Sequence, residues 1–118
     1  IMQEAEDPGR VSFLCACPGR LDVVAKFKEC GKDPRHAGWR GVRTQTHTYV
    51  MELGYDPVAR PARYLYSLSC DKQQRSTLDM TVPEHRQTAI RLEETVKTWL
   101  RDQKDGFWER WLSEAEPL

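Results

Sequence analysis

The sequence predicts an α+β fold, in which a small antiparallel sheet of about four strands packs against a long C-terminal helix and a shorter helix. Residues 39–50 and 63–68 change side-chain character at every second position, as strands with one covered face do. Residues 83–103 repeat apolar side chains every three or four positions, as a helix lying on a sheet does. The predicted order of strand, helix, strand, strand and helix is typical of the α+β class.

Length and charge limit the classes of function. The 118 residues suffice for one domain, which we expect over residues 11–118 after a flexible lead-in at 1–10. Lys plus Arg and Asp plus Glu are both 18, so we expect no nucleic-acid partner. No apolar run approaches the ~20 residues that cross a bilayer, so we expect no membrane partner. Because the chain starts at Ile1, without an initiator methionine, we expect a piece of a longer protein.

The first half is predicted to contain a strand, a helix and a loop. Residues 11–17 are almost all apolar, which predicts a central, well-covered strand. Helical spacing follows over 21–30, and Gly31 and Pro34 are typical of the end of a helix. Residues 32–38 then form a loop that leads into the next strand.

Residues 39–50 are predicted to form one strand with two different faces. One face carries Val42, Thr44, Thr46, Thr48 and Val50, and the other carries Arg43, Gln45, His47 and Tyr49. The second face is expected to meet solvent or a polar partner. A turn that includes 56–60 should return the chain, so that 63–68 pairs with this strand as a long-looped hairpin.

The last third is predicted to be mainly helical. Residues 71–79 are polar and lack periodicity, which indicates a loop. Pro83 is a favourable first residue for the long helix, whose end is predicted at residues 105–106. The aromatic segment 107–112 could add one or two helical turns.

The four cysteines do not indicate a disulfide framework. Cys15 and Cys17 would share one face of a strand, a geometry too strained for an ordinary disulfide. We interpret Cys15, Cys17, Cys30 and Cys70 first as small buried apolar residues. A zinc site that combines Cys15, Cys17 and Cys30 with His36 is the alternative, but its spacing fits no familiar zinc-ligand pattern.

Two motifs resemble the C-terminal region of the sulfatase family. The first is W-R-x-[VI]-R-T-x-x-x-x-Y-[VI], matched by Trp39, Arg40, Val42, Arg43, Thr44, Tyr49 and Val50. The second, L-Y-[DN]-L-x-x-D-P-x-x-x-x-N-L, is similar to residues 65–78, with Leu65, Tyr66, Leu68, Asp71 and Leu78 in place. Ser67, Lys72 and Thr77 depart from it, which puts the local turn geometry in doubt.

The resemblance implies the C-terminal, non-catalytic part of a sulfatase, a sulfuric ester hydrolase. Its partner would be the catalytic domain of the same protein, which in this family holds a formylglycine and calcium outside this chain. The chain alone is then expected to be inactive and to have no cofactor of its own. The parent sulfatase would be periplasmic or secreted, and an exposed apolar surface would favour self-association of the isolated chain.

No catalytic or metal-binding residue is predicted within the chain. A formylglycine signature requires Pro or Ala two residues after the cysteine and Arg four residues after it, and neither Cys15 nor Cys17 has these residues at those positions. The Asp residues are too scattered to hold calcium. Residues expected at the rim of the substrate pocket are His36, Trp39, Arg40, Arg43 and His47, together with the turn at 56–60. The alternative function is a stand-alone binding module for a protein or for an anion held by Trp39, Arg40, Arg43 and His47.

Overall fold

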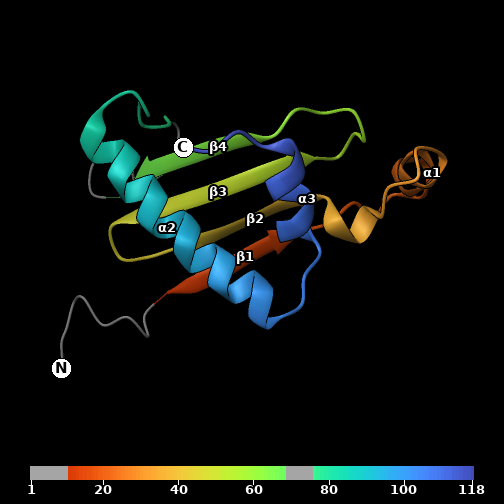
Figure 1. Cartoon of the computed structure of the whole chain (residues 1–118), viewed down its shortest axis with the longest axis horizontal. Coiled ribbons are helices and arrows are strands. Elements are labelled where there is room, and N and C mark those ends of the chain that lie inside the picture. Colours follow the sequence, from red (N-terminus) through yellow and green to blue (C-terminus); the bar gives the residue numbers. More distant parts are fainter. Residues whose placement is uncertain (1–10, 69–75) are drawn as a thin grey trace.

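The computed structural model describes residues 11–68 and 76–118. Their elements are β1 (Ser12–Ala16), α1 (Leu21–Glu29), the 3₁₀-helix η1 (Pro34–His36), β2 (Gly38–Arg43), β3 (His47–Gly54), β4 (Ala62–Ser67), α2 (Pro83–Asp102) and α3 (Phe107–Glu114). The strands form one antiparallel sheet in the order β1-β2-β3-β4, and α2 crosses one face of it (Figure 1). The predicted α+β fold is therefore confirmed. The predicted lead-in, Cys70 and residues 71–75 of the predicted polar loop lie outside the described residues.

Residues 39–50 do not form one strand, so that prediction is wrong. They form most of the β2–β3 hairpin, whose turn is built around the Thr44 side chain. The Thr44 hydroxyl oxygen accepts hydrogen bonds from the N–H groups of Thr46 (3.2 Å) and His47 (3.1 Å), and the Thr44 N–H donates to the His47 carbonyl (2.9 Å). Local bonds of this kind favour turns over extended strands. In β3 the predicted faces are reversed, because Tyr49 is fully buried beneath the helices while Thr48 and Val50 line the opposite face.

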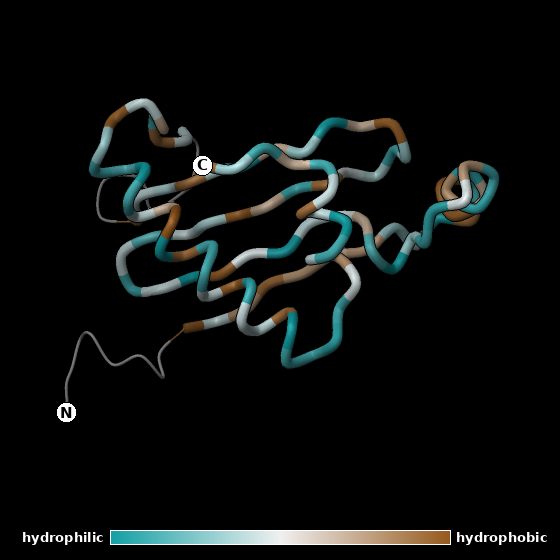
Figure 2. The backbone as a smooth tube through the Cα atoms, in the orientation of Figure 1, coloured by the Kyte–Doolittle hydropathy of each residue, from teal (hydrophilic) through white to brown (hydrophobic). Residues whose placement is uncertain are grey.

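Strand β1 is an edge strand, whereas the sequence predicted a central one. It pairs with β2 alone among the described strands, and its residues are exposed or half-buried. Most of its residues are hydrophobic nonetheless, as the hydropathy colouring in Figure 2 shows. Phe13 stacks on Trp99 of α2 at 4.6 Å between ring centroids, and Leu14 points to the opposite face. A strand that is apolar on both faces therefore need not be central.

The hydrophobic core lies between the sheet and the two C-terminal helices. The strands contribute Val42, Tyr49, Met51, Leu53 and Leu65, and the helices contribute Ala89, Leu92, Val96, Leu100, Phe107, Trp108 and Trp111. The helical contributions of α2 follow the apolar spacing that predicted this helix. The predicted hairpin between residues 63–68 and the preceding strand is also confirmed, as the β3–β4 pair.

Helix α1 confirms the prediction for 21–30 but lies beside the sheet and away from α2 (Figure 1). Its only buried residue is Phe27, while Leu21 is 86% exposed. Gly31 follows the helix with φ +71°, the conformation expected of a glycine that ends a helix. The Lys32 ammonium donates a hydrogen bond to the Pro57 carbonyl at 2.6 Å, which connects the segment after α1 to the β3–β4 loop.

The cysteines that the structure describes are exposed, so the prediction that they are buried is wrong. Cys15, Cys17 and Cys30 are free thiols at the surface. Cys15 lies on the edge strand, Cys17 follows that strand, and Cys30 ends the outlying helix α1. None of these elements is covered well enough to bury a thiol.

Candidate functional site

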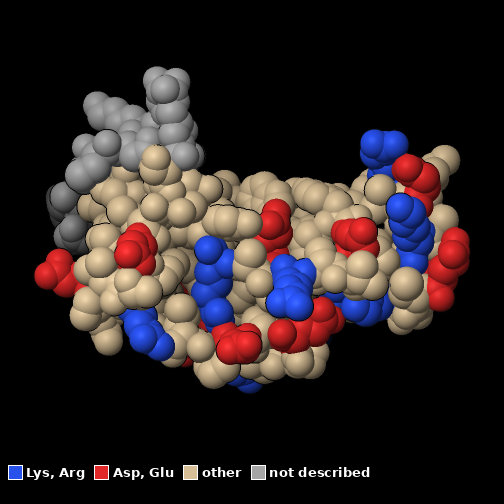
Figure 3. All heavy atoms as spheres, turned by 90° about the horizontal axis from the view of Figure 1, so that it is seen from above, with Lys and Arg blue, Asp and Glu red and all other residues tan. Residues whose placement is uncertain are grey.

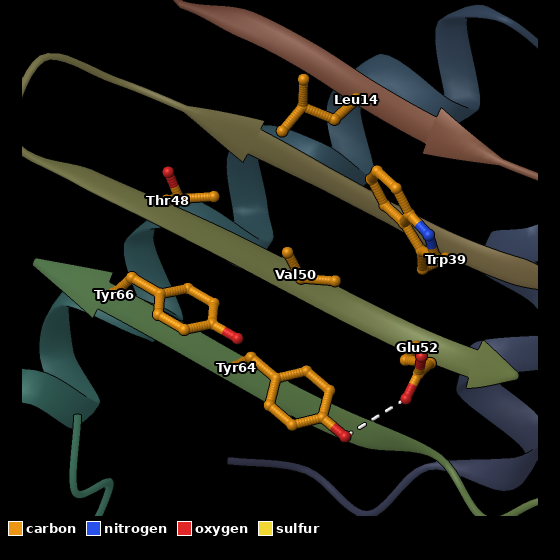
Figure 4. Close-up of a pocket in the computed structure, with 7 residues that line it drawn as sticks. All are labelled: Leu14, Trp39, Thr48, Val50, Glu52, Tyr64 and Tyr66. Carbon is orange, nitrogen blue, oxygen red and sulfur yellow. Dashed lines mark hydrogen bonds between the residues drawn. The ribbon is translucent and has the colours of Figure 1, made fainter. Parts of the chain in front are cut away.

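The face of the sheet opposite α2 is the candidate functional site, and we call it the open face. Its side chains come from all four strands: Leu14, Trp39, Thr48, Val50, Glu52, Tyr64 and Tyr66. Strand register places them in rows, with Trp39 opposite Glu52, Val50 opposite Tyr64, and Thr48 opposite Tyr66. Together they line a shallow hollow of about 520 Å³ (Figure 4). The open face is thus apolar and aromatic where a solvated sheet face would be polar.

Gly41 lies between Leu14 and Val50 in the middle row of the open face. A Cβ atom at this position would lie 2.6 Å from the Tyr49 carbonyl oxygen, closer than side-chain carbons come to backbone oxygens. The position therefore requires glycine. It also leaves the backbone of β2 without a side chain between its two apolar neighbours.

The polar groups of the open face are few. The Tyr64 hydroxyl donates a hydrogen bond to a Glu52 carboxylate oxygen at 3.2 Å. Burial and the negative charge of Glu52 raise the pKa of Tyr64, so its hydroxyl stays protonated as the donor. The Thr48 hydroxyl is buried and finds no hydrogen-bond partner among the described residues. A buried polar group without a hydrogen-bond partner is unfavourable.

Trp39 and Arg43 are the two predicted rim residues that lie on the open face. Trp39 pairs with Glu52 at one end of β2, and Arg43 pairs with Thr48 at the other end, where it is exposed. Both residues are therefore available to a partner that covers this face.

Arg40 lies on the other face of the sheet and is only 2% exposed. Its guanidinium donates to the two carboxylate oxygens of Asp105, at 2.7 and 3.4 Å. The remaining N–H groups donate to backbone carbonyls that include those of Ala37 (3.0 Å) and Arg35 (2.8 Å), and the group stacks on Phe107 at 4.6 Å from the ring centroid. Since an arginine has five N–H donors, Arg40 has none left for an external anion.

The two histidines that the sequence analysis places at the rim, His36 and His47, lie at opposite ends of the sheet. His36 belongs to η1, where its carbonyl accepts a 3.4 Å hydrogen bond from Arg110 of α3. His47 starts β3, and burial together with the positive charges of Arg91 and His85 lowers the pKa of its imidazole. His47 is therefore neutral at pH 7. The five predicted residues do not meet at one site, and those of the alternative anion site are divided between the two faces.

A second polar cluster is half-buried on the helix-covered face, and sequence reasoning missed it. The Tyr49 hydroxyl donates to Glu93 of α2 at 2.5 Å, and the Arg63 guanidinium donates to the same carboxylate at 2.9 Å. Arg63 also lies 5.0 Å from the ring centroid of Trp111. The available signal was the position of Glu93, which lies four residues after Ala89 on the apolar stripe of α2.

Charge and residue clusters do not indicate other kinds of site in the described chain. On the face drawn in Figure 3, basic and acidic side chains are interspersed. Residues 11–68 and 76–118 contain no group of three or more His, Cys, Asp or Glu placed to hold a metal ion. Within the same residues, no helix is both long and apolar enough to cross a membrane.

Comparison with known proteins adds no relative. No family model, no curated protein and no solved structure matches this chain.

Proposed function

We propose that this chain is the non-catalytic C-terminal part of a sulfatase and that its open face packs on the catalytic domain. The observation that carries the proposal is the uncovered aromatic face of the sheet. Domains are built from at least two packed layers, and here one face of the sheet has its helical layer while the other has none among the described residues. A catalytic domain of the same protein would supply the missing layer.

The composition of the open face supports an interface over a solvated surface. Trp39, Tyr64 and Tyr66 are half-buried, and they surround Val50 on a continuous part of the sheet. Contiguous apolar surface of this kind usually marks a contact with another protein, and tryptophan and tyrosine are enriched in such contacts.

The sulfatase-like motif contributes to both faces of this sheet. Arg40 and Tyr49 point into the helix-covered core, while Trp39 and Arg43 belong to the open face. The motif residues would therefore stabilise the subdomain and also shape its contact with the catalytic domain.

The end of the sheet near α1 is the part that we propose for the rim of the substrate pocket. Gly38 pairs with Gly54 there, so the segment from His36 to Trp39 lies beside the β3–β4 loop. The hydrogen bond from Lys32 to Pro57 joins the residues just before η1 to the same β3–β4 loop. Trp39 would then contribute both to the domain contact and to the rim.

Turnover of an aryl sulfate and the coding sequence upstream of Ile1 test this function. The isolated chain should show no hydrolysis above background, and the upstream sequence should encode a catalytic domain with a formylglycine signature. Hydrolysis by the isolated chain would contradict the non-catalytic role. An upstream sequence without a sulfatase domain would favour the stand-alone protein-binding module instead.

A further inference from the structure

We propose that Glu52 on the open face receives an arginine side chain from the domain that covers the sheet. The identity of that domain rests on the proposed function, whereas the preference for a guanidinium group rests on contacts within this chain. The inference combines the position of Glu52, its missing counter-charge and the way in which this chain holds its own arginines.

Glu52 lies between two strands that carry aromatic side chains. Trp39 is its cross-strand partner on β2, and the Tyr64 hydroxyl contacts its carboxylate from β4 at 3.2 Å (Figure 4). The carboxylate therefore lies next to a tyrosine hydroxyl, and Glu52 lines the hollow of the open face together with Trp39 and Tyr64. A cation that entered the hollow could contact the carboxylate and an aromatic ring together.

The carboxylate of Glu52 has no cationic partner within 4.0 Å among the described residues. Its neighbours in the hollow are neutral at pH 7, because they are apolar, aromatic or hydroxyl side chains. Covering this face without a cation would remove water from the carboxylate and leave its charge uncompensated. That cost is large, so a covering domain must place a positive or strongly donating group here.

Elsewhere the chain repeatedly places an arginine between a carboxylate and an aromatic ring. Arg40 contacts Asp105 and Phe107, and Arg63 contacts Glu93 and Trp111. In a third case, Arg110 contacts Glu114 at 2.7 Å and lies 5.7 Å from the ring centroid of Phe27. Glu52 has a similar setting on the open face, with Trp39 and Tyr64 lining the same hollow, but no arginine of the described residues forms an ion pair with it.

Arginine suits this position better than lysine or an anion. A guanidinium is planar, so it can donate two hydrogen bonds to a carboxylate while it stacks on a ring. The negative charge of Glu52 disfavours a sulfate or phosphate at the same place. A neutral sugar could also stack on Trp39 or Tyr64, and the experiment must separate that occupant from a guanidinium.

The test uses the isolated chain and ethylguanidinium as a probe for the arginine side chain. Its binding is followed by NMR through the Trp39 indole N–H and the backbone amides of β3 and β4. We expect saturable shifts, and Glu52→Gln should weaken binding about fivefold, the size of effect measured for exposed ion pairs. Added salt should weaken it as well. Glu109→Gln, which changes an exposed carboxylate on α3, is the matched control and should leave the titration unchanged.

Two neutral probes complete the experiment. Ethylurea has nearly the shape of ethylguanidinium without its charge, and a methyl glucoside represents a sugar. The proposal would be overturned if ethylurea bound as tightly as ethylguanidinium, if only the glucoside bound saturably, or if no probe gave a saturable shift. It would also be overturned if Glu52→Gln left the ethylguanidinium titration unaltered in a variant that melts like the parent chain. Because no catalytic domain is present, these outcomes are independent of whether the chain belongs to a sulfatase.

Discussion

The two faces of the sheet differ in whether their charged side chains have ion-pair partners. On the helix-covered face, Arg40 meets Asp105 and Arg63 meets Glu93, so each strand arginine has a carboxylate from the C-terminal part of the chain. On the open face, Glu52 and Arg43 have no ion-pair partner among the residues that the structure describes. The first face is complete within one chain. The second has unpaired charges and no covering layer among the described residues, and for this reason we propose it as an interface.

Removing Asp105 should have the largest effect on stability. Asp105→Ala leaves the guanidinium of Arg40 buried without its counter-charge, and breaking a buried pair in this way costs about 3–5 kcal/mol. Urea unfolding monitored by tryptophan fluorescence measures the loss. Asp22→Ala breaks the exposed pair with Arg20 and should cost no more than about 1 kcal/mol. Similar losses in the two variants would show that the pair of Arg40 and Asp105 contributes no more to stability than an exposed pair.

Substitutions of two neighbouring residues on β4 compare how much each face of the sheet contributes to stability. Leu65 is fully buried against the helices, so Leu65→Ala should lower the free energy of unfolding by about 2–5 kcal/mol. Tyr64 lies half-buried on the open face, and Tyr64→Ala in the isolated chain should cost roughly 1 kcal/mol or less. Chemical denaturation of both variants checks the difference. Equal costs would mean that the open face already belongs to the core.

Acidification should weaken the covered face through Asp105. Burial alone would raise the pKa of this carboxyl, but hydrogen bonds from Arg40 and the Phe107 N–H, with the charge of Arg40, lower it below the ordinary 3.8. A group with a lowered folded-state pKa stabilises the fold above its unfolded-state pKa, and this contribution is lost as the pH falls through the folded-state pKa. The free energy of unfolding should therefore decrease below about pH 4. The free energy of unfolding of the Asp105→Asn variant should decrease less over the same pH range. If it fell with pH as steeply as that of the parent chain, Asp105 would not be the group responsible.

Thr48→Val should have the smallest effect in the isolated chain. The substitution replaces a buried hydroxyl that has no partner among the described residues by a methyl group of similar size. Stability should stay constant or rise by up to about 1 kcal/mol, because an unmet hydrogen-bonding group is removed. Thermal unfolding provides the measurement, and a clear loss of stability would reveal a hydrogen bond made by the hydroxyl within the chain.

Periodicity predicted the α+β class and the position of α2, because repeated apolar residues such as Leu92 and Val96 specify one buried stripe. It failed at the β2–β3 turn, where Thr44 and Thr46 continue the β-branched pattern while the Thr44 hydroxyl closes the turn. A pattern of residue types does not reveal such a local hydrogen bond.

The candidate site was harder to predict, because it depends on contacts between distant parts of the chain. Arg40 and Arg43 look alike in the sequence, yet one is neutralised by Asp105 and the other is exposed. Glu52, in turn, lies beyond the strand predicted at residues 39–50. Only the register of β3 and β4 places Glu52 beside Tyr64 on an uncovered face.

Hydroxyl-radical footprinting tests most directly whether the open face is covered in the whole protein. The isolated chain and the full protein encoded by the same gene would be labelled under identical conditions, with Leu112, which is 63% exposed on α3, as the internal reference. We predict that Trp39 and Tyr64 are oxidised in the isolated chain and protected in the full protein, while Leu112 reacts equally in both. Equal oxidation of Trp39 and Tyr64 in the two samples would contradict the proposed interface.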